Sequence, residues 1–139
     1  MQLSPRLESL VLKKGVQIGV LSESDRALVL ALAANAIEAG RPHREDEVNR
    51  RLLDWLADVG AMLRTDHVEL RRWLVDGGYV ARDPWGHAYE RGRAELERAR
   101  DVLGTSDSDA LARAVRSARV AAQSTRVAHR RAYESQRPA

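Results

Sequence analysis

The chain has 139 residues and a formal net charge of +3, and this length suits one ordinary domain with an appendage. Cysteine is absent, which excludes disulfides, thiolate metal sites and a cysteine nucleophile, and favours a reducing cytoplasm as the location. The longest apolar run, Ala27 to Ile37, is too short to cross a bilayer and no leader opens the chain, so we expect no membrane partner.

A helix is predicted from Ser22 to about Glu38. Ser22 is a suitable N-cap, acidic residues follow it, and Gly40 and Pro42 end the pattern. Positions 27–37 are apolar on nearly every face, so this helix is either central to the core or shared with a second subunit.

Two further helices follow. The first runs from about Glu45 to Leu56 with an apolar stripe at helical spacing, and the second begins after the caps Thr65 and Asp66 and ends at Gly77. In this third helix Leu70 and Leu74 form the inner face. The outer face is expected to carry Thr65, Val68, Glu69 and Arg72.

Residues 79–82 and 87–91 are predicted to be two short strands around a turn at 83–86, where Pro84 and Gly86 fit a type I turn. A short helix from Glu95 to Val102 and a long one from about Asp109 to Tyr133 complete the chain. The fold class is therefore mainly α.

Three helices followed by a two-stranded β-hairpin is the order of the winged variant of the helix-turn-helix. We expect an N-terminal segment (residues 1–20), a winged-helix domain (21–91) and C-terminal helices (92–139) that include a long helix with a possible dimerisation role and a basic tail. The same order also occurs in domains that never contact nucleic acid.

Several spaced motifs resemble a known bacterial family. They are an acidic-Val-Asn opening at Glu47-Val48-Asn49, the segment Leu70-Arg71-Arg72-Trp73-Leu74-Val75-Asp76 with a following glycine, the pair Arg82-Asp83, and a late aromatic at Tyr89. This pattern resembles the family of domain of unknown function 2087 over residues 21–91. The resemblance implies a winged-helix regulator and carries over no catalytic residue. His43, Arg44 and Glu90 depart from it, where an aromatic, a capping Ser or Thr and a tryptophan are usual.

The third helix supplies the first candidate DNA contacts. Arg72 faces outward, where arginine can pair with guanine or phosphate, and Glu69 can accept from a cytosine amino group. Thr65 shares their face. A solvated helix face is the alternative for all three. We expect Arg71 to form an internal ion pair with Asp76 or an acid of the preceding helix, and Asn49 to have a structural role.

The hairpin and the last helix supply the other candidates. Arg82 and Trp85 are placed to reach the minor groove, although Trp85 can instead fold back as a hydrophobic lid. The basic stripe of the last helix is made by Arg116, Arg119, Arg126 and Arg130. It either attracts DNA or is the solvated side of a helix packed on a partner. Residues 1–103 contain 16 Lys/Arg against 17 Asp/Glu, and residues 104–139 contain 7 against 3, so only the tail is basic.

No enzyme is expected. The histidines are scattered, no metal-ligand spacing, phosphate loop or nucleophile elbow is present, and we assign no catalytic residue, metal or cofactor. The sequence therefore predicts a DNA-binding transcriptional regulator that acts as a winged-helix homodimer on double-stranded DNA. Its first helix and its last helix would form the dimer surface. The alternative is a non-catalytic protein–protein interaction module on the same scaffold, which the near-neutral body favours.

Overall fold

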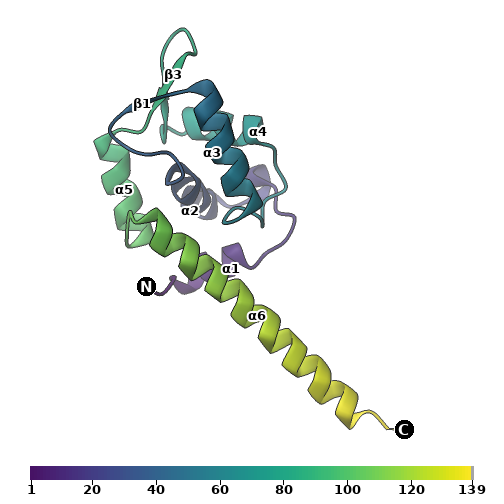
Figure 1. The fold of residues 1–139 in the computed structure, drawn as a ribbon. Coiled ribbons are helices and arrows are strands. Elements are labelled where there is room, and N and C mark those ends of the chain that lie inside the picture. Colours follow the sequence, from purple (N-terminus) through teal and green to yellow (C-terminus); the bar gives the residue numbers. More distant parts are fainter. Residues whose placement is uncertain (139) are drawn as a thin grey trace.

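Helix α2 (Glu23–Ala34) lies at the centre of the structure, a computed structural model that describes residues 1–138 (Figure 1). Ser22 caps it by accepting a hydrogen bond from the Asp25 amide at 3.2 Å. Every residue from Leu28 to Ala34 is buried, so a single chain covers all faces of this helix. The structure thus selects the central position that the sequence had left open. The expectation that this helix contributes a dimer surface is wrong.

Helices α3 (Glu45–Ala57) and α4 (His67–Asp76) pack against each other, and α4 also contacts α2. Both have the bounds that the sequence predicted to within a residue or two. Asp66 caps α4 by accepting from the Glu69 amide at 2.8 Å, and Leu70 and Leu74 are fully buried. Because α4 is fixed by these two leucines, its opposite face has a defined direction.

A small antiparallel sheet packs beside these helices. The predicted hairpin consists of β2 (Ala81–Arg82) and β3 (Ala88–Glu90), and its turn is closed by a hydrogen bond from the Gly86 amide to the Asp83 carbonyl at 3.1 Å. Gly86 has a φ of +73°, which favours glycine. A third strand, β1 (Pro42–Arg44), pairs with β3 and gives the strand order β1-β3-β2. No strand was predicted at the position of β1.

The junction between β1 and α3 is held by a polar cluster around Glu47. Its carboxylate accepts from Arg41 Nη2 at 2.7 Å and lies 3.1 Å from His43 Nδ1, while His43 Nε2 lies 2.7 Å from the Glu38 carbonyl. His43 is buried. The hydrogen bond from Arg41 first and the neighbouring His43 second lower the pKa of Glu47 from 4.5 to about 2. Arg44 provides no side-chain cap for α3, and in the first turn the Asp46 carboxylate accepts from the Glu47 amide at 2.9 Å.

This cluster predicts an acid-sensitive junction. Since the folded-state pKa of Glu47 lies below its ordinary value, its contribution to stability is complete above pH 4.5 and is lost as the pH falls towards about 2. Glu47→Gln should therefore show a smaller loss of unfolding free energy than the parent over that range. Urea unfolding at several pH values measures the difference, and parallel curves for the two proteins would contradict the prediction.

The remaining helices surround this body. Helix α1 (Pro5–Val11), where no helix was predicted, packs on α2 and α6, and a short 3-10 helix spans Ile18–Val20. Helix α5 (Arg93–Leu103) packs on α2. Helix α6 (Ser108–Gln136) buries Leu111 and Val115 in the same core, and its later turns project away from the body (Figure 1). Within residues 1–138, no helix combines the length and apolarity that a membrane span requires.

Candidate nucleic-acid interface

The outward side of α4 is the first component of the candidate interface. Val68, Glu69 and Arg72 are exposed there, opposite the buried Leu70 and Leu74. This is the face that the sequence predicted, and it follows from the helical period once the two leucines are fixed in the core. The helix therefore presents an arginine and an apolar side chain to solvent on one side.

A groove of about 180 Å³ separates α4 from the hairpin. Arg72 of α4 and Arg82 of β2 both line it, so the structure brings together two arginines from different elements. Within residues 1–138 neither forms an ion pair or a side-chain hydrogen bond. The guanidinium of Arg82 lies against Gly86, where a side chain would collide with it. Both residues are exposed to solvent.

Arg71 has a different role from its neighbour. Its Nη1 lies 3.0 Å from Glu45 Oε1 and also donates to Asn49, and its guanidinium lies over the Tyr89 ring at 5.6 Å from the centroid. The predicted internal ion pair is confirmed, with an acid of the preceding helix as partner. Arg71 therefore ties α4 to α3 and to the sheet, and Asn49 has the structural role that the sequence suggested.

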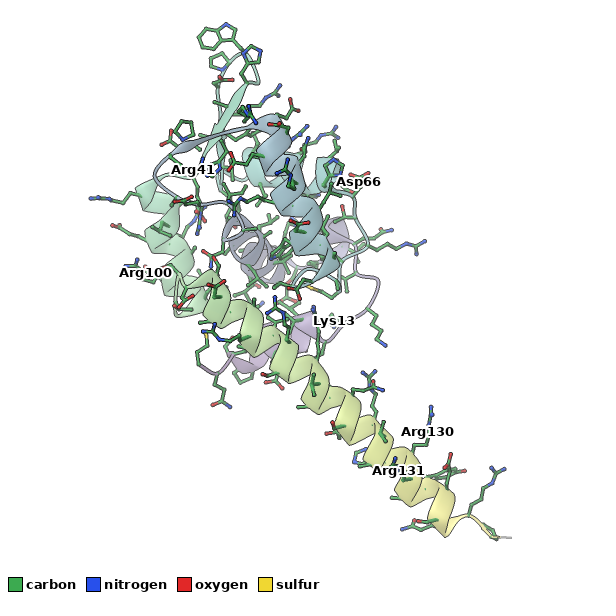
Figure 2. The ribbon with its side chains drawn as sticks, viewed as in Figure 1. Lys13, Arg41, Asp66, Arg100, Arg130 and Arg131 are labelled. Carbon is green, nitrogen blue, oxygen red and sulfur yellow. The ribbon has the colours of Figure 1, made fainter. Side chains whose placement is uncertain are left out.

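The start of α4 is polar but not cationic. Thr65 Oγ1 donates to Glu69 Oε2 at 2.8 Å, so these two predicted contact residues pair with each other. Figure 2 shows Asp66, which caps the helix, at the same end. A carboxylate pair at this end repels phosphate, so DNA contact here would have to be with a base edge.

Trp85 lies at the tip of the hairpin, which extends beyond the body at the end opposite the C-terminus (Figure 1). Its side chain is 75% exposed. The interpretation of Trp85 as a hydrophobic lid is therefore wrong. The Trp85 ring is therefore available to contact a partner at the hairpin tip.

The arginine stripe of α6 is divided by the structure. Arg116 forms an ion pair with Asp58 and lowers the pKa of that carboxyl group, and Arg119 donates to the carbonyls of Asp58 and Val59 at 2.6 and 2.7 Å. These contacts hold α6 against the loop after α3, so Arg116 and Arg119 are engaged within the chain. Sequence spacing alone could not show this, because Asp58 is distant in the sequence.

Arg126 and Arg130 belong to the projecting half of α6. Figure 2 shows Arg130 and Arg131 directed away from the body, and every residue from Gln123 to Pro138 is exposed. The stripe therefore has one half that packs on the protein and one half in solvent. Elsewhere, no group of three or more His, Asp or Glu side chains in residues 1–138 is placed to hold a metal ion.

Comparison with known proteins gives one result. A family model described as an uncharacterized protein conserved in bacteria (DUF2087) matches residues 21–91, the segment from the residue before the α2 cap to the end of the sheet. No curated protein and no solved structure matches the chain. The matched segment contains α4 and the hairpin, and so contains the groove between Arg72 and Arg82.

Proposed function

The chain belongs to the DUF2087 family of uncharacterized bacterial proteins, and we propose that it is a DNA-binding transcriptional regulator without catalytic activity. Residues 21–91 would form a winged helix. The element order α2-β1-α3-α4-β2-β3 and the strand order β1-β3-β2 support this assignment, because a helix-turn-helix is followed by a hairpin that flanks its second helix. A cytoplasmic location follows from this role.

The observation that carries the proposal is the pair of unengaged arginines on one groove. In this reading α4 enters the major groove, which is wide enough for a helix, and Arg72 reaches a guanine or a phosphate. Arg82 and Trp85 of the hairpin lie beside it and reach the adjacent minor groove, where arginines and apolar wedges are used. Val68 provides an apolar contact on the same helix face.

Binding to duplex DNA tests the proposal. The body has nearly balanced charge, so we expect few phosphate contacts and a moderate dependence on salt. Fluorescence anisotropy with random-sequence duplexes should show binding that weakens as salt rises from about 50 to about 200 mM, each phosphate contact adding roughly 0.9 to the slope of log affinity against log salt. The absence of binding at micromolar protein at the lowest salt would reject the proposal.

We further propose that the regulator is a homodimer joined by the projecting half of α6. The sequence predicted a dimer surface made by α2 and α6. Because α2 is enclosed in the core, the projecting half of α6 is the part of that surface that is still exposed. It carries three large exposed apolar side chains, Val120, Val127 and Tyr133. Two copies would then present two α4 helices to a two-fold site.

Truncation after Arg119 tests the dimer. This variant keeps Leu111 and Val115 in the core and keeps the contacts of Arg119, so the body should stay folded. Light scattering should give twice the chain mass for the parent and a single chain mass for the variant. An equal mass for both would contradict the role of α6. If the parent dimerises but binds no duplex, the protein-interaction module becomes the better explanation.

A further inference from the structure

The N-terminal loop (residues 13–21) is attached to the chain just before α4 by backbone hydrogen bonds. The Val16 amide donates to the Met62 carbonyl at 2.9 Å, and the Arg64 amide donates to the Val16 carbonyl at 2.7 Å, so the two segments form a parallel bridge. Residues 62–64 lead directly into the N-cap of α4. The loop is therefore fixed beside the start of the helix that we propose to enter the major groove.

The same loop borders one flank of α4. Gly19 packs on the Trp73 ring, which lies 3.8 Å from the place of a β-carbon at this position. Arg26 fixes the contact, because its guanidinium lies over the Trp73 ring at 4.8 Å from the centroid and donates to three carbonyls of residues 18–21. Val75, two positions after Trp73 and so on the other flank of α4, lines the groove beside the hairpin. The exposed face of α4 thus has the hairpin on one side and the N-terminal loop on the other.

Three exposed cations lie on this border: Lys13 and Lys14 in the loop, and Arg64 in the segment with which the loop pairs. Within residues 1–138 their side chains form no ion pair and no hydrogen bond with the protein. Gly15, with a φ of +68°, makes the turn that joins the two lysines to the bridge. Three unpaired positive charges within a few residues of one fixed backbone contact attract negatively charged groups.

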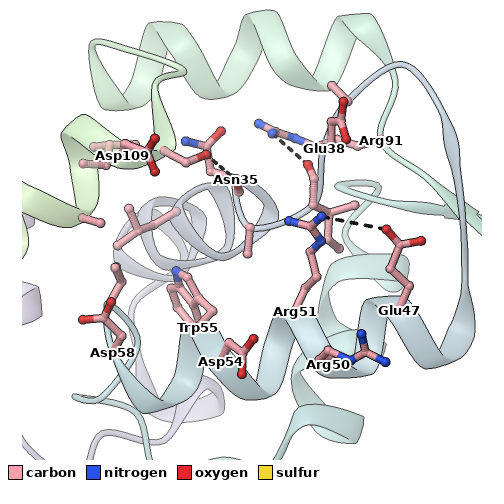
Figure 3. Close-up of a pocket in the computed structure, with 18 of the residues that line it drawn as sticks. Asn35, Glu38, Glu47, Arg50, Arg51, Asp54, Trp55, Asp58, Arg91 and Asp109 are labelled. Carbon is pink, nitrogen blue, oxygen red and sulfur yellow. Dashed lines mark hydrogen bonds and ion pairs between the residues drawn. The ribbon is translucent and has the colours of Figure 1, made fainter.

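The far side of α3 has a different charge. A cavity of about 810 Å³ lies there, and the end of α2, the outer side of α3 and the connection between α5 and α6 form its walls (Figure 3). Its lining contains six carboxylates against four arginines, and one of these arginines, Arg91, is already paired with the buried Glu95. This lining repels phosphate, so the charge distribution of the body favours a duplex on the side of α4 and the N-terminal loop.

We propose that Lys13, Lys14 and Arg64 bind phosphates of the DNA strand that borders the major groove on the side away from the hairpin. This inference rests on the proposed DNA-binding function. The major groove is about 12 Å wide, so a helix in it has one sugar–phosphate strand on each side. The hairpin adjoins one of these strands and the N-terminal loop adjoins the other. Because phosphate contacts position a protein and base contacts specify the sequence, the loop sets the register of α4 on the duplex.

The salt dependence of duplex binding tests the assignment. Lys13→Gln combined with Lys14→Gln should lower the slope of log affinity against log salt by about 2, since each lost phosphate contact removes roughly 0.9. Addition of Arg64→Gln should lower it by roughly a further 0.9. Arg50→Gln combined with Arg51→Gln is the matched control. It also removes two exposed cations, but from the cavity side of α3 (Figure 3), and should leave the slope nearly unchanged.

The lysines also allow a direct footprint, because Lys13, Lys14 and the amine of Met1 are the only aliphatic amines of the chain. Acetylation with an N-hydroxysuccinimide ester, followed by mass spectrometry, measures the reactivity of each amine. Bound duplex should slow the acetylation of both lysines several-fold. The Met1 amine is the internal reference, since Met1 lies beside α6 and should react as fast as in the free protein.

A charge-conserving variant separates a phosphate contact from a change in folding. Lys13→Arg combined with Lys14→Arg keeps both charges and should keep the slope of the parent. The inference is overturned, while the proposed function stands, if the parent binds duplex and the glutamine pair loses no more slope than the Arg50 and Arg51 control. Lysines that stay fully reactive in the complex, or a lower slope for the arginine pair, overturn it equally. If the parent binds no duplex, the proposed function and this inference fail together.

Discussion

Glu95→Gln should lower the free energy of unfolding by about 3–5 kcal/mol, the largest loss that we expect from a single isosteric change in this chain. Glu95 and Arg91 are both nearly inaccessible to solvent and form an ion pair between the end of the sheet and α5. Glutamine keeps the volume and removes the charge. The Arg91 guanidinium then remains buried as an uncompensated cation, which is the costly arrangement.

Two controls separate this effect from a general weakening of α5. Glu97→Gln makes the same change at an exposed position of the same helix and should cost less than about 0.5 kcal/mol. The double variant Arg91→Met with Glu95→Leu removes both charges and should recover most of the loss, because a buried pair replaced by apolar groups is often neutral. Urea unfolding measures all three. A loss below about 1 kcal/mol for Glu95→Gln would show that Arg91 is solvated.

The second large effect concerns DNA. Arg72→Ala and Arg82→Ala should each weaken duplex binding by about 1–3 kcal/mol, which is roughly 5- to 150-fold, if each arginine contacts a base. The double variant should lose more than either single variant, because the two guanidinium groups line one groove but come from α4 and β2. Unfolding stability should stay unchanged, since neither has an intrachain partner within residues 1–138.

Arg113→Ala is the matched control for this pair. Arg113 is also an exposed arginine in a helix interior, but it lies on α6 beside the N-terminal segment, away from α4. We expect it to change duplex affinity by no more than the small non-specific contribution of one charge. If Arg113→Ala weakens binding as much as Arg72→Ala, the interaction is a diffuse electrostatic one and α4 has no special role.

The elements that the sequence predicted well have strong local signals. Ser22 and Asp66 are N-caps, and the side chain of each accepts a hydrogen bond from the backbone amide three residues later. Gly86 and Gly104 have left-handed backbone conformations, the first in the hairpin turn and the second at the end of α5. Arg72 could be placed on the outside because Leu70 and Leu74 define the inside. These features depend on neighbours within a few residues, which is the range that sequence patterns report.

The missed features depend on distant contacts. Strand β1 has three residues and begins with a proline, too short for any alternation, and it exists because His43 pairs in register with Tyr89. Arg119 was assigned to a basic stripe that either attracts DNA or is the solvated side of a packed helix, yet it donates to carbonyls of the loop after α3. Helix α1 is the exception, because it had a detectable local signal: Leu3, Leu7 and Leu10 recur at helical spacing.

The burial of Asn35 and Arg91 was also not predictable from the sequence. Asn35 and Arg91 are separated by the whole of α3, α4 and the hairpin, and nothing local marks either as buried. Asparagine at the end of a helix is common as a C-cap, and arginine is usually exposed. Only the packing of α5 against α2 encloses them.

Hydrogen–deuterium exchange on a protein–duplex complex tests the central claim most directly. Duplexes are first enriched from a random pool by retention on the protein, and exchange is then compared with and without the retained DNA. The account predicts slower backbone amide exchange in residues 65–90, which contain α4 and the hairpin, and little change in α5. Protection confined to α6, or a pool that yields no retained duplex, would contradict it.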